Sequence, residues 1–480
     1  MNNYYNIDEV MKYFYEISKI PRMSGKEQRI ADYIEEFAKK RNLKYVRDVY
    51  NNVIIIKESS KRDRSEKSII LQCHLDMVCE KEEKSKHNFE EEGLELYIEG
   101  DYIKAKGTTL GADNGIGIAI ILSILDSDKI SHPRIEAIFT VQEETTMDGA
   151  KKIDTGILQG KRMICLDNMN EDELWIGCAG AKIFKYQTEG RKTNTNNSKE
   201  KQLIKIVLNG FVGGHSGKDI SKERGNPIKE MGAFLKILYK KYGILLKSIY
   251  GGRKVNVIPR ECYSEIYIKY EDLDKVKEEI DIFNKSLRNR ILEDNKNIRL
   301  YIEKMEEKSN DCFDKDTTKK MIDIIIDIPN GVYYRDQYTN PLVSLNIGKI
   351  ESHKNELQLS FSIRSNRSSI EKKLLEELEF IRNKYNMKET RNELYGYEHE
   401  EKSEFIDKCK EIYRECFKRD PKMIDMHICL EAGFFASKIP GLDFIAIAPN
   451  IYDAHSPKER CSITSLKKIY NYILLILEDI

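Results

Sequence analysis

Histidine and acidic residues stand at the ends of apolar runs that predict buried strands, which is where α/β proteins place their sites. His74 and Asp76 follow the run 68–73, and Asp167 follows the run 162–166. A metal-ligating imidazole needs a carboxylate or carbonyl partner that fixes its tautomer, so a His-x-Asp pair is chemically sensible. On a strand, these two residues would share a face. The alternative is an ordinary strand-capping histidine beside a surface aspartate.

A glycine-rich turn carries another acidic residue. Residues 107–117 contain four glycines, which let the backbone approach a ligand closely. Their spacing matches neither the dinucleotide fingerprint nor the P-loop. Asp113 lies at the centre of this turn, just before a helix that we expect to begin near Gly115. Its carboxylate could bridge two metal ions, or it could simply cap the helix.

Two adjacent carboxylates, Glu143 and Glu144, end the predicted strand 135–141. Neighbours on a strand point in opposite directions, so one could bind a cation while the other handles protons. A solvated acidic strand exit is the alternative. His455 lies in a loop after the apolar run 443–449. Two histidines and three carboxylates suit two divalent ions such as zinc, manganese or cobalt. The predicted ligand set is His74, Asp113, Glu144, Asp167 and His455.

A second group of polar residues lies further along the chain. His215 stands in a glycine-rich turn, Asn256 follows a basic segment, and Arg364 ends the run 361–363. An imidazole, an amide and a guanidinium together could bind a carbonyl oxygen and a carboxylate. Each residue alone could equally be an ordinary turn or strand-edge residue.

Composition narrows the class of protein. The chain has 480 residues, with 80 Lys+Arg and 80 Asp+Glu, so its formal net charge is zero. This argues against a nucleic-acid binder with a basic surface. The longest apolar run, 115–125, is too short to span a membrane. The ten cysteines contain no C-x-x-C pair, and the first residues do not form a signal peptide, so we expect reduced thiols and a cytoplasmic protein.

The elements that must position these residues suggest two domains, one of them split. Residues 6–40 predict two helices broken at Pro21, with Ser24 and Glu27 as a capping box for the second. Strands and helices then alternate, which favours an α/β domain with a mostly parallel sheet. Alternating polar and apolar strands follow and indicate an α+β domain with an antiparallel sheet. The predicted domains are 1–182, an insertion 183–394, and 395–480, which completes the first domain.

The motifs as a set resemble one enzyme family. The matching segments are ILQCHLDMVCEK, GTTLGADNGIGIA, HPRIEAIFTVQEET, IGCAGA, GGHSGKDI, GGRKVNVIPRE, HICLEAG and HSPKER. They occur in the family's order from about residue 70 to residue 460. On these segments the chain resembles the M20 metallopeptidases, in the aminoacyl-histidine dipeptidase (Xaa-His dipeptidase) branch. The resemblance implies a catalytic α/β domain interrupted by a lid domain.

The resemblance also implies a dinuclear metal site, most simply of zinc. His74 and Asp167 would serve one ion, Glu144 and His455 the other, and Asp113 would bridge them.

The resemblance assigns roles to five further residues. Asp76 would orient the imidazole of His74. Glu143 would be the general base that takes a proton from the water between the metals and passes it to the leaving amine. His215, on the lid, would stabilise the oxyanion, and Asn256 and Arg364 would hold the substrate.

The implied activity is hydrolysis of unblocked dipeptides, of the Xaa-His type. A tripeptidase or a deacylase of N-acyl amino acids is the alternative within the same clan, and a non-catalytic metal-binding module is a more remote one. Thr146 and Ala432 replace a Gly and a Cys of the family pattern, which puts substrate preference in question more than activity. Many members of the family dimerise through the lid, so the resemblance implies a homodimer as one option. An internal duplication within 183–394 could instead supply that contact inside one chain.

Overall fold

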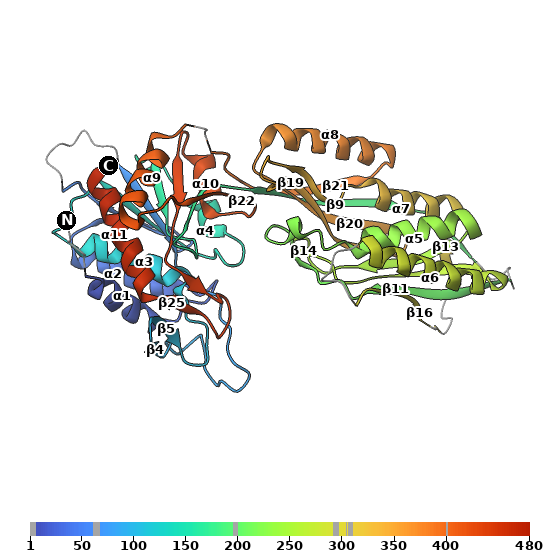
Figure 1. Ribbon diagram of the computed structural model, residues 1–480, viewed down its shortest axis with the longest axis horizontal. Helices are drawn as coiled ribbons and strands as arrows, with labels where there is room; N and C mark the ends of the chain where they lie inside the picture. Colours follow the sequence, from blue (N-terminus) through green and yellow to red (C-terminus); the bar gives the residue numbers. More distant parts are fainter. Residues whose placement is uncertain are drawn as a thin grey trace. The chain divides into compact units, whose positions relative to one another are not determined.

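The chain folds into two compact units (Figure 1). The computed structural model describes residues 6–60, 68–194, 200–290, 297–303, 305, 311–399 and 402–480. The first unit contains Met1–Cys178, Gly396–Met426 and Leu430–Ile480, and the second contains Ala179–Tyr395 with His427–Cys429. The second unit is therefore inserted into the first along the chain.

A mixed eight-stranded sheet is the centre of the first unit. Its pairs β6–β3, β3–β7, β7–β23 and β8–β22 are parallel, and the pairs at the β1–β2–β6 side are antiparallel. β23 comes from the C-terminal part of the chain and lies between β7 and β8. The strands in sheet order are β1 (Lys44–Arg47), β2 (Val53–Lys57), β6 (Ile135–Thr140), β3 (Ile69–His74), β7 (Arg162–Cys165), β23 (Asp443–Ala446), β8 (Glu173–Cys178) and β22 (Lys422–Met426).

Five helices share one hydrophobic core with this sheet. They are α1 (Asp8–Ser18), α2 (Gln28–Lys40), α3 (Ala112–Asp126), α9 (Glu404–Phe417) and α11 (Ile463–Asp479). α3 is buried along nearly its whole length, as its continuous apolar sequence predicts. Two shorter helices, α4 (Asp148–Lys152) and α10 (Glu431–Lys438), contact each other. A small sheet joins β24 (Ile451–Tyr452), β25 (Arg460–Ser462), β5 (Tyr102–Ala105) and β4 (Leu96–Glu99).

The predicted break at Pro21 is confirmed, because α1 ends at Ser18 and α2 begins at Gln28. The predicted capping box is wrong. The N-cap of α2 is Glu27, and no side chain caps the helix. The Ser24 hydroxyl instead donates to Asp76 Oδ2 at 2.7 Å, because the 20–27 segment lies against the turn that follows β3.

The second unit is an antiparallel sheet with four long helices. Its sheet order is β16 (Arg299–Glu303), β11 (Lys201–Asn209), β15 (Cys262–Lys269), β13 (Leu245–Gly251), β19 (Pro341–His353), β20 (Glu356–Ser365), β9 (Gly180–Glu189) and β21 (Lys388–Leu394), with β18 (Gly331–Arg335) beside β19. The helices are α5 (Pro227–Tyr242), α6 (Leu273–Arg290), α7 (Lys315–Asp327) and α8 (Ser368–Lys384). Short paired strands complete it: β10 (Lys192–Asn194) with β17 (Asp311–Phe313), and β12 (Gly214–His215) with β14 (Val257–Ile258).

The topology of this sheet is internally symmetric. Apart from the short strands, β11-α5-β13-β15-α6-β16 and β9-α7-β19-β20-α8-β21 repeat the same strand–helix–strand–strand–helix–strand order. Within the sheet each half places its second strand at the shared border, followed outward by its third, first and fourth. The halves meet where β13 pairs with β19. The second unit is thus a duplicated motif, with one half inserted into the other.

The predicted fold class is confirmed: an α/β domain with a sheet rich in parallel pairs is interrupted by an α+β domain with an antiparallel sheet. In the described part of the chain, no helix has the length and apolar character needed to cross a membrane.

Candidate metal centre

Neighbouring parallel strands bring the predicted ligands to one edge of the first sheet. β3 ends at His74, and Asp167 comes two residues after the end of the adjacent β7. Glu143 and Glu144 follow the end of β6, on the other side of β3. Because these strands are parallel, their carboxyl ends share one edge, the usual position for a site in an α/β sheet.

Asp113 lies between the two histidines. Its Oδ1 is 3.0 Å from His74 Nε2, and its Oδ2 is 3.1 Å from His455 Nε2. His455 Nε2 is also 2.8 Å from Glu144 Oε1, and His74 Nε2 is 4.0 Å from Asp167 Oδ1. One oxygen of Asp113 therefore faces each half of the cluster, which is the arrangement that a bridging carboxylate requires.

Three overlapping triads in this cluster have ligand atoms within 4.8 Å of one another. His74 with Asp113 and Asp167 is one, and Asp113 with Glu144 and His455 is another. These two triads share only Asp113. The third joins His74 to Glu143 and Glu144. All five predicted ligands are thus brought together.

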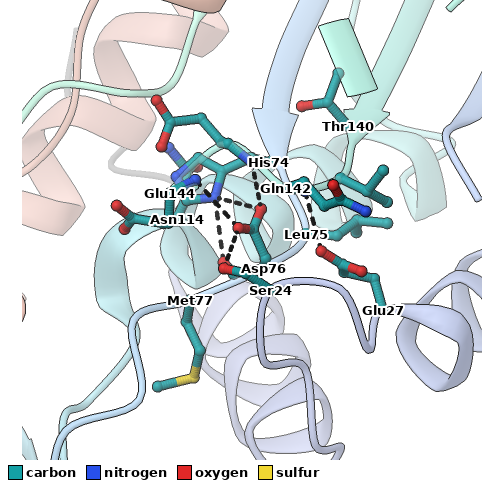
Figure 2. Close-up of polar contacts among 12 residues, drawn as sticks. Ser24, Glu27, His74, Leu75, Asp76, Met77, Asn114, Thr140, Gln142 and Glu144 are labelled. Carbon is teal, nitrogen blue, oxygen red and sulfur yellow. Dashed lines mark hydrogen bonds and ion pairs between the residues drawn. The ribbon is translucent and has the colours of Figure 1, made fainter. Parts of the chain in front are cut away.

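The orientation of His74 favours its use as a ligand. Its Nδ1 is 3.1 Å from the Asp76 carbonyl oxygen and 3.4 Å from Asp76 Oδ1 (Figure 2). Nδ1 therefore donates its proton to Asp76, and Nε2, which faces Asp113, is the nitrogen left for a cation. A partner of this kind fixes the tautomer of a metal-ligating histidine. Both side chains are completely buried.

The electrostatics of the cluster fit a pair of divalent cations. In the protein alone, burial and the Asp113 carboxylate raise the pKa of Asp167 to about 7. Burial and the Asp167 carboxylate raise the pKa of Glu143 well above its ordinary value. Glu144 Oε1 is buried and faces the His455 imidazole at 2.8 Å. Several carboxylates held this close disfavour one another's charge, and bound cations reverse that effect. Imidazole nitrogens and carboxylate oxygens are the donors that zinc, manganese and cobalt accept.

The local backbone differs from the sequence-based expectation at two places. Asp76 is not on β3, which ends at His74, and Glu143 and Glu144 are in a turn rather than on β6. Strand alternation therefore does not set the directions of these side chains, and the prediction made from it is wrong. The residues come together because Asp76 turns back and accepts the backbone N–H groups of Glu143 and Glu144, at 3.0 and 3.2 Å.

The first turn of α3 is also irregular, because Asp113 and Asn114 have non-helical dihedral angles. The peptide bond between them is cis. The Asn114 side chain donates to the Leu166 carbonyl oxygen at 2.8 Å and so ties the start of α3 to the segment that carries Asp167.

Two buried side chains that hold these turns are not predicted from the sequence. The Arg22 guanidinium donates to the carbonyl oxygens of Leu75 and Asp76, at 3.2 and 3.1 Å, and to that of Gly111. The Glu459 carboxylate accepts the four successive amides of residues 110–113, at 2.8–3.4 Å. Glu459 belongs to the HSPKER segment, so its proximity to His455 was an available signal. Arg22 follows the helix-breaking Pro21 and carried no such signal.

The other three predicted site residues meet around Ser216 in the second unit. Asn256 is exposed, and its carbonyl oxygen accepts the Ser216 N–H at 2.9 Å. The buried Arg364 donates through Nε to Ser216 Oγ at 3.2 Å, and its other side-chain partner is the uncharged Cys429 Sγ. His215 precedes Ser216 and pairs through β12 with β14.

The hydrogen bonds of His215 determine its tautomer. Nδ1 accepts the N–H groups of Gly217 and Lys218, each at 3.2 Å, so the ring proton resides on Nε2. Burial, followed by the Arg364 charge, lowers the pKa of His215 to about 4. The ring is therefore neutral at pH 7 and offers one hydrogen-bond donor.

Comparison with known proteins identifies the family. The model of peptidase family M20/M25/M40 matches residues 70–479. The chain belongs to this family. The family predicted from the motifs is confirmed, and this M20 chain is a hydrolase of peptide bonds.

Two similar proteins cover almost the whole M20 chain. A cytosol non-specific dipeptidase of Escherichia coli is 30% identical over 97% of this chain and 96% of its own. The crystal structure of an aminoacylhistidine dipeptidase from Vibrio alginolyticus has a TM-score of 0.89 at 29% identity, covering 98% of this chain and 96% of that one. Aminopeptidase PepT from Bacillus cereus shares the fold, with a TM-score of 0.62 at 15% identity over 99% of both chains.

Proposed function

We propose that the protein is a dinuclear-metal dipeptidase that hydrolyses unblocked dipeptides, including those of the Xaa-His type. The observation that carries the proposal is the position of Asp113, which faces His74 with one oxygen and His455 with the other. The likeness to dipeptidases over nearly the full chain supports the substrate class. A tripeptidase and an N-acyl amino acid deacylase are less supported.

The ligand roles follow from the two triads that share Asp113. His74 and Asp167 would hold one ion, Glu144 and His455 the other, and Asp113 both. We propose zinc, with manganese or cobalt as substitutes, because imidazole–carboxylate sets accept all three. When bound, such ions polarise a substrate carbonyl and lower the pKa of water.

Glu143 is the proposed general base. It lies beside the ligand Glu144 in the turn after β6, and its carboxylate is grouped with those of the ligands. Burial raises the pKa of Glu143 and so favours a proton on its carboxylate. The charge of bound cations would lower that pKa and restore the basicity of the carboxylate. Glu143 would accept a proton from water and deliver it to the nitrogen of the leaving amine.

The second unit, Ala179–Tyr395 with His427–Cys429, is the proposed lid and corresponds to the insertion predicted at 183–394. His215 Nε2–H would donate to the carbonyl oxygen as negative charge develops there, because a neutral donor fixed by two backbone amides needs no reorganisation. Arg364 and Asn256 would hold the substrate carboxylate. The Arg364 guanidinium suits that role because its neighbours Ser216 and Cys429 are uncharged.

We propose a cytoplasmic protein whose partners are small zwitterionic peptides. All ten cysteines lie in the described part of the chain and none forms a disulfide, which suits a reducing compartment. The zero net charge suits neutral substrates, and we propose neither nucleic-acid nor membrane binding.

Replacement of the general base tests the mechanism. We expect Glu143→Ala to lower kcat by at least about 10²- to 10⁴-fold, the usual contribution of general acid–base catalysis. Metal content, measured by atomic emission, should stay near two ions per chain. Full turnover in Glu143→Ala would contradict the assignment.

A substrate panel tests the specificity. Xaa-His dipeptides, other dipeptides, tripeptides and N-acyl amino acids are compared with zinc, manganese and cobalt in turn. Dipeptides should give the highest kcat/KM. Faster cleavage of a tripeptide or an N-acyl amino acid would replace the proposed substrate class.

A further inference from the structure

The turn that carries Glu143 and Glu144 is held by its backbone amides. Four consecutive N–H groups, those of residues 141–144, are each accepted by a side chain from elsewhere in the first unit. The acceptors are Asn52 Oδ1 for Val141 at 3.1 Å, Glu27 Oε1 for Gln142 at 3.0 Å, Asp76 Oδ1 for Glu143 at 3.0 Å and Asp76 Oδ2 for Glu144 at 3.2 Å.

The three accepting side chains are themselves fixed. Asn52, Glu27 and Asp76 are 1%, 3% and 0% exposed, so solvent does not compete for their oxygens. Glu27 Oε1 also accepts the Gly25 N–H at 2.8 Å, and Ser24 Oγ donates to Asp76 (Figure 2). The segment between α1 and α2 therefore reaches the turn through Glu27 directly and through Ser24 by way of Asp76.

Gln142 is the residue at which this support matters most. Its φ of +58° is left-handed, a conformation that costs free energy for a residue with a Cβ. The Gln142 carbonyl oxygen accepts the Met147 N–H at 2.7 Å and the Thr146 N–H at 3.2 Å. Gln142 thus closes the turn, and a change in its dihedral angles would rotate Glu143 and Glu144 together.

We propose that Glu27 is a positioning residue for this turn: by accepting the Gln142 N–H, it holds Gln142 in its left-handed conformation and so aims the Glu143 carboxylate. The proposal rests on the proposed role of Glu143. It also accounts for Glu27 better than the capping box predicted from sequence, because no side chain caps α2.

The contacts of Glu27 define two informative substitutions. Glu27→Gln keeps an oxygen that can accept from both Gly25 and Gln142, so kcat should stay close to that of the parent. Glu27→Asp keeps the charge but shortens the side chain by one methylene, so it should release the Gln142 N–H. Substitution of a residue that supports a metal site typically lowers activity about 10- to 100-fold. We expect a loss of kcat of this size in Glu27→Asp and in Glu27→Ala.

The same strand offers a matched control. Glu136, near the start of β6, is also fully buried and accepts two loop amides, those of Gln159 and Gly160, each at 3.0 Å. It lies far along β6 from the turn. Glu136→Ala should therefore lower stability as Glu27→Ala does, while kcat per folded, metal-loaded chain stays unchanged.

The experiment measures kcat, KM, metal content and thermal unfolding for all variants of the full chain, loaded with zinc. Positioning predicts that Glu27→Asp and Glu27→Ala lose kcat with KM unchanged and two ions bound, and that Glu27→Gln does not. Unchanged kcat in both, or loss of folding in both, would overturn the proposal by assigning Glu27 to stability alone.

Glu143→Ala is measured in parallel to separate the two proposals. If Glu143→Ala is inactive while Glu27→Asp and Glu27→Ala behave like Glu136→Ala, only the role of Glu27 is overturned. If Glu143→Ala itself retains turnover, the general base is misassigned, and any kcat loss in the Glu27 variants would have to act through another residue of the turn.

Discussion

At each histidine of the metal cluster, a proton and a metal ion compete for the ring nitrogen Nε2. Burial lowers the pKa of His74, but its hydrogen bonds to Asp113 and Asp76 outweigh burial and raise the pKa well above the ordinary value. Hydrogen bonds to Asp113 and Glu144 raise the pKa of His455 to about 10. Both rings are therefore protonated at neutral pH in the metal-free protein, and each must lose a proton before Nε2 can bind a cation.

Metal binding should accordingly release at least two protons per chain near pH 7.5, because protons held by Asp167 and Glu143 would add to those of the two histidines. The apparent metal affinity should rise as pH rises towards 10. Calorimetric titration of the metal-free protein with zinc, in buffers of different ionisation enthalpy, counts these protons. His455→Ala should reduce the count by about one. A binding enthalpy that is independent of the buffer would contradict the prediction.

The pKa of His215 is shifted in the opposite direction. It is lowered to about 4, so the ring stays neutral down to that pH. We expect His215→Ala to lower kcat about 10²- to 10³-fold, the usual effect of removing one donor to an oxyanion. The ratio of parent to variant kcat should be constant from pH 6 to pH 9. A ratio that changed near pH 6.5 would show that His215 titrates in the reaction and would contradict the neutral-donor role.

The five clustered residues could be predicted because the segments that carry them occur together and in the family's order, although each segment alone was ambiguous. The supporting residues were not predictable in that way. Arg22, Glu27 and Glu459 act through backbone carbonyl and amide groups that lie far away in sequence. Nothing in the neighbourhoods of Arg22 and Glu27 marks those partners, whereas Glu459 stands in the same segment as His455.

At the scale of elements, the helix α3, which carries Asp113, packs closely against β3. Gly117 faces β3, where a Cβ would lie 3.1 Å from Cys73 Cβ and would collide with the Asn114 side chain. Asn114 holds the Leu166 carbonyl oxygen just before Asp167. The positions of the segments that carry Asp113 and Asp167 therefore depend on residue 117 having no Cβ.

Gly117→Ala should lower the free energy of unfolding by about 1–3 kcal/mol, the usual cost of overpacking a core. Because Asn114 is displaced, metal affinity should fall as well. Denaturant unfolding and zinc titration measure the two effects. Gly156→Ala, at an exposed position whose close neighbours are side-chain atoms of Asp154 alone, is the control and should change neither quantity appreciably.

Most elements were predictable because their patterns are strong. β2, β3 and β6 read as short β-branched runs, and α11 reads as an amphipathic helix. The errors lie at the ends of elements. There β3 and β6 stop before Asp76 and Glu143, and the Ser24–Glu27 pair serves another turn in place of α2. Tertiary hydrogen bonds decide such boundaries, and local propensity does not contain them.

At the scale of the whole molecule, the symmetric sheet of the second unit bears on assembly. In a single half, the border strand would present unpaired backbone groups to another copy. Here β13 and β19 of one chain pair with each other, so the contact is made internally. We therefore propose that one chain supplies this contact by itself and that a homodimer through the lid is not required for activity.

A mixing experiment checks this proposal. His215→Ala and Glu143→Ala variants are combined, exchanged and assayed, and the mass of the parent protein is measured by sedimentation. Action within one chain predicts that the mixture is no more active than the sum of the two variants. Recovery of activity on mixing would show that His215 is supplied by a partner.

The position of β23 has a consequence for biosynthesis. This strand, from residues 443–446, lies between β7 and β8, and His455 follows it close to the end of the chain. A growing chain on the ribosome can fold the second unit early, because that unit is almost continuous in sequence. The sheet of the first unit and its ligand set are completed only after β23 and His455 have emerged. A product of translation interrupted before residue 455 should therefore be inert in peptide hydrolysis.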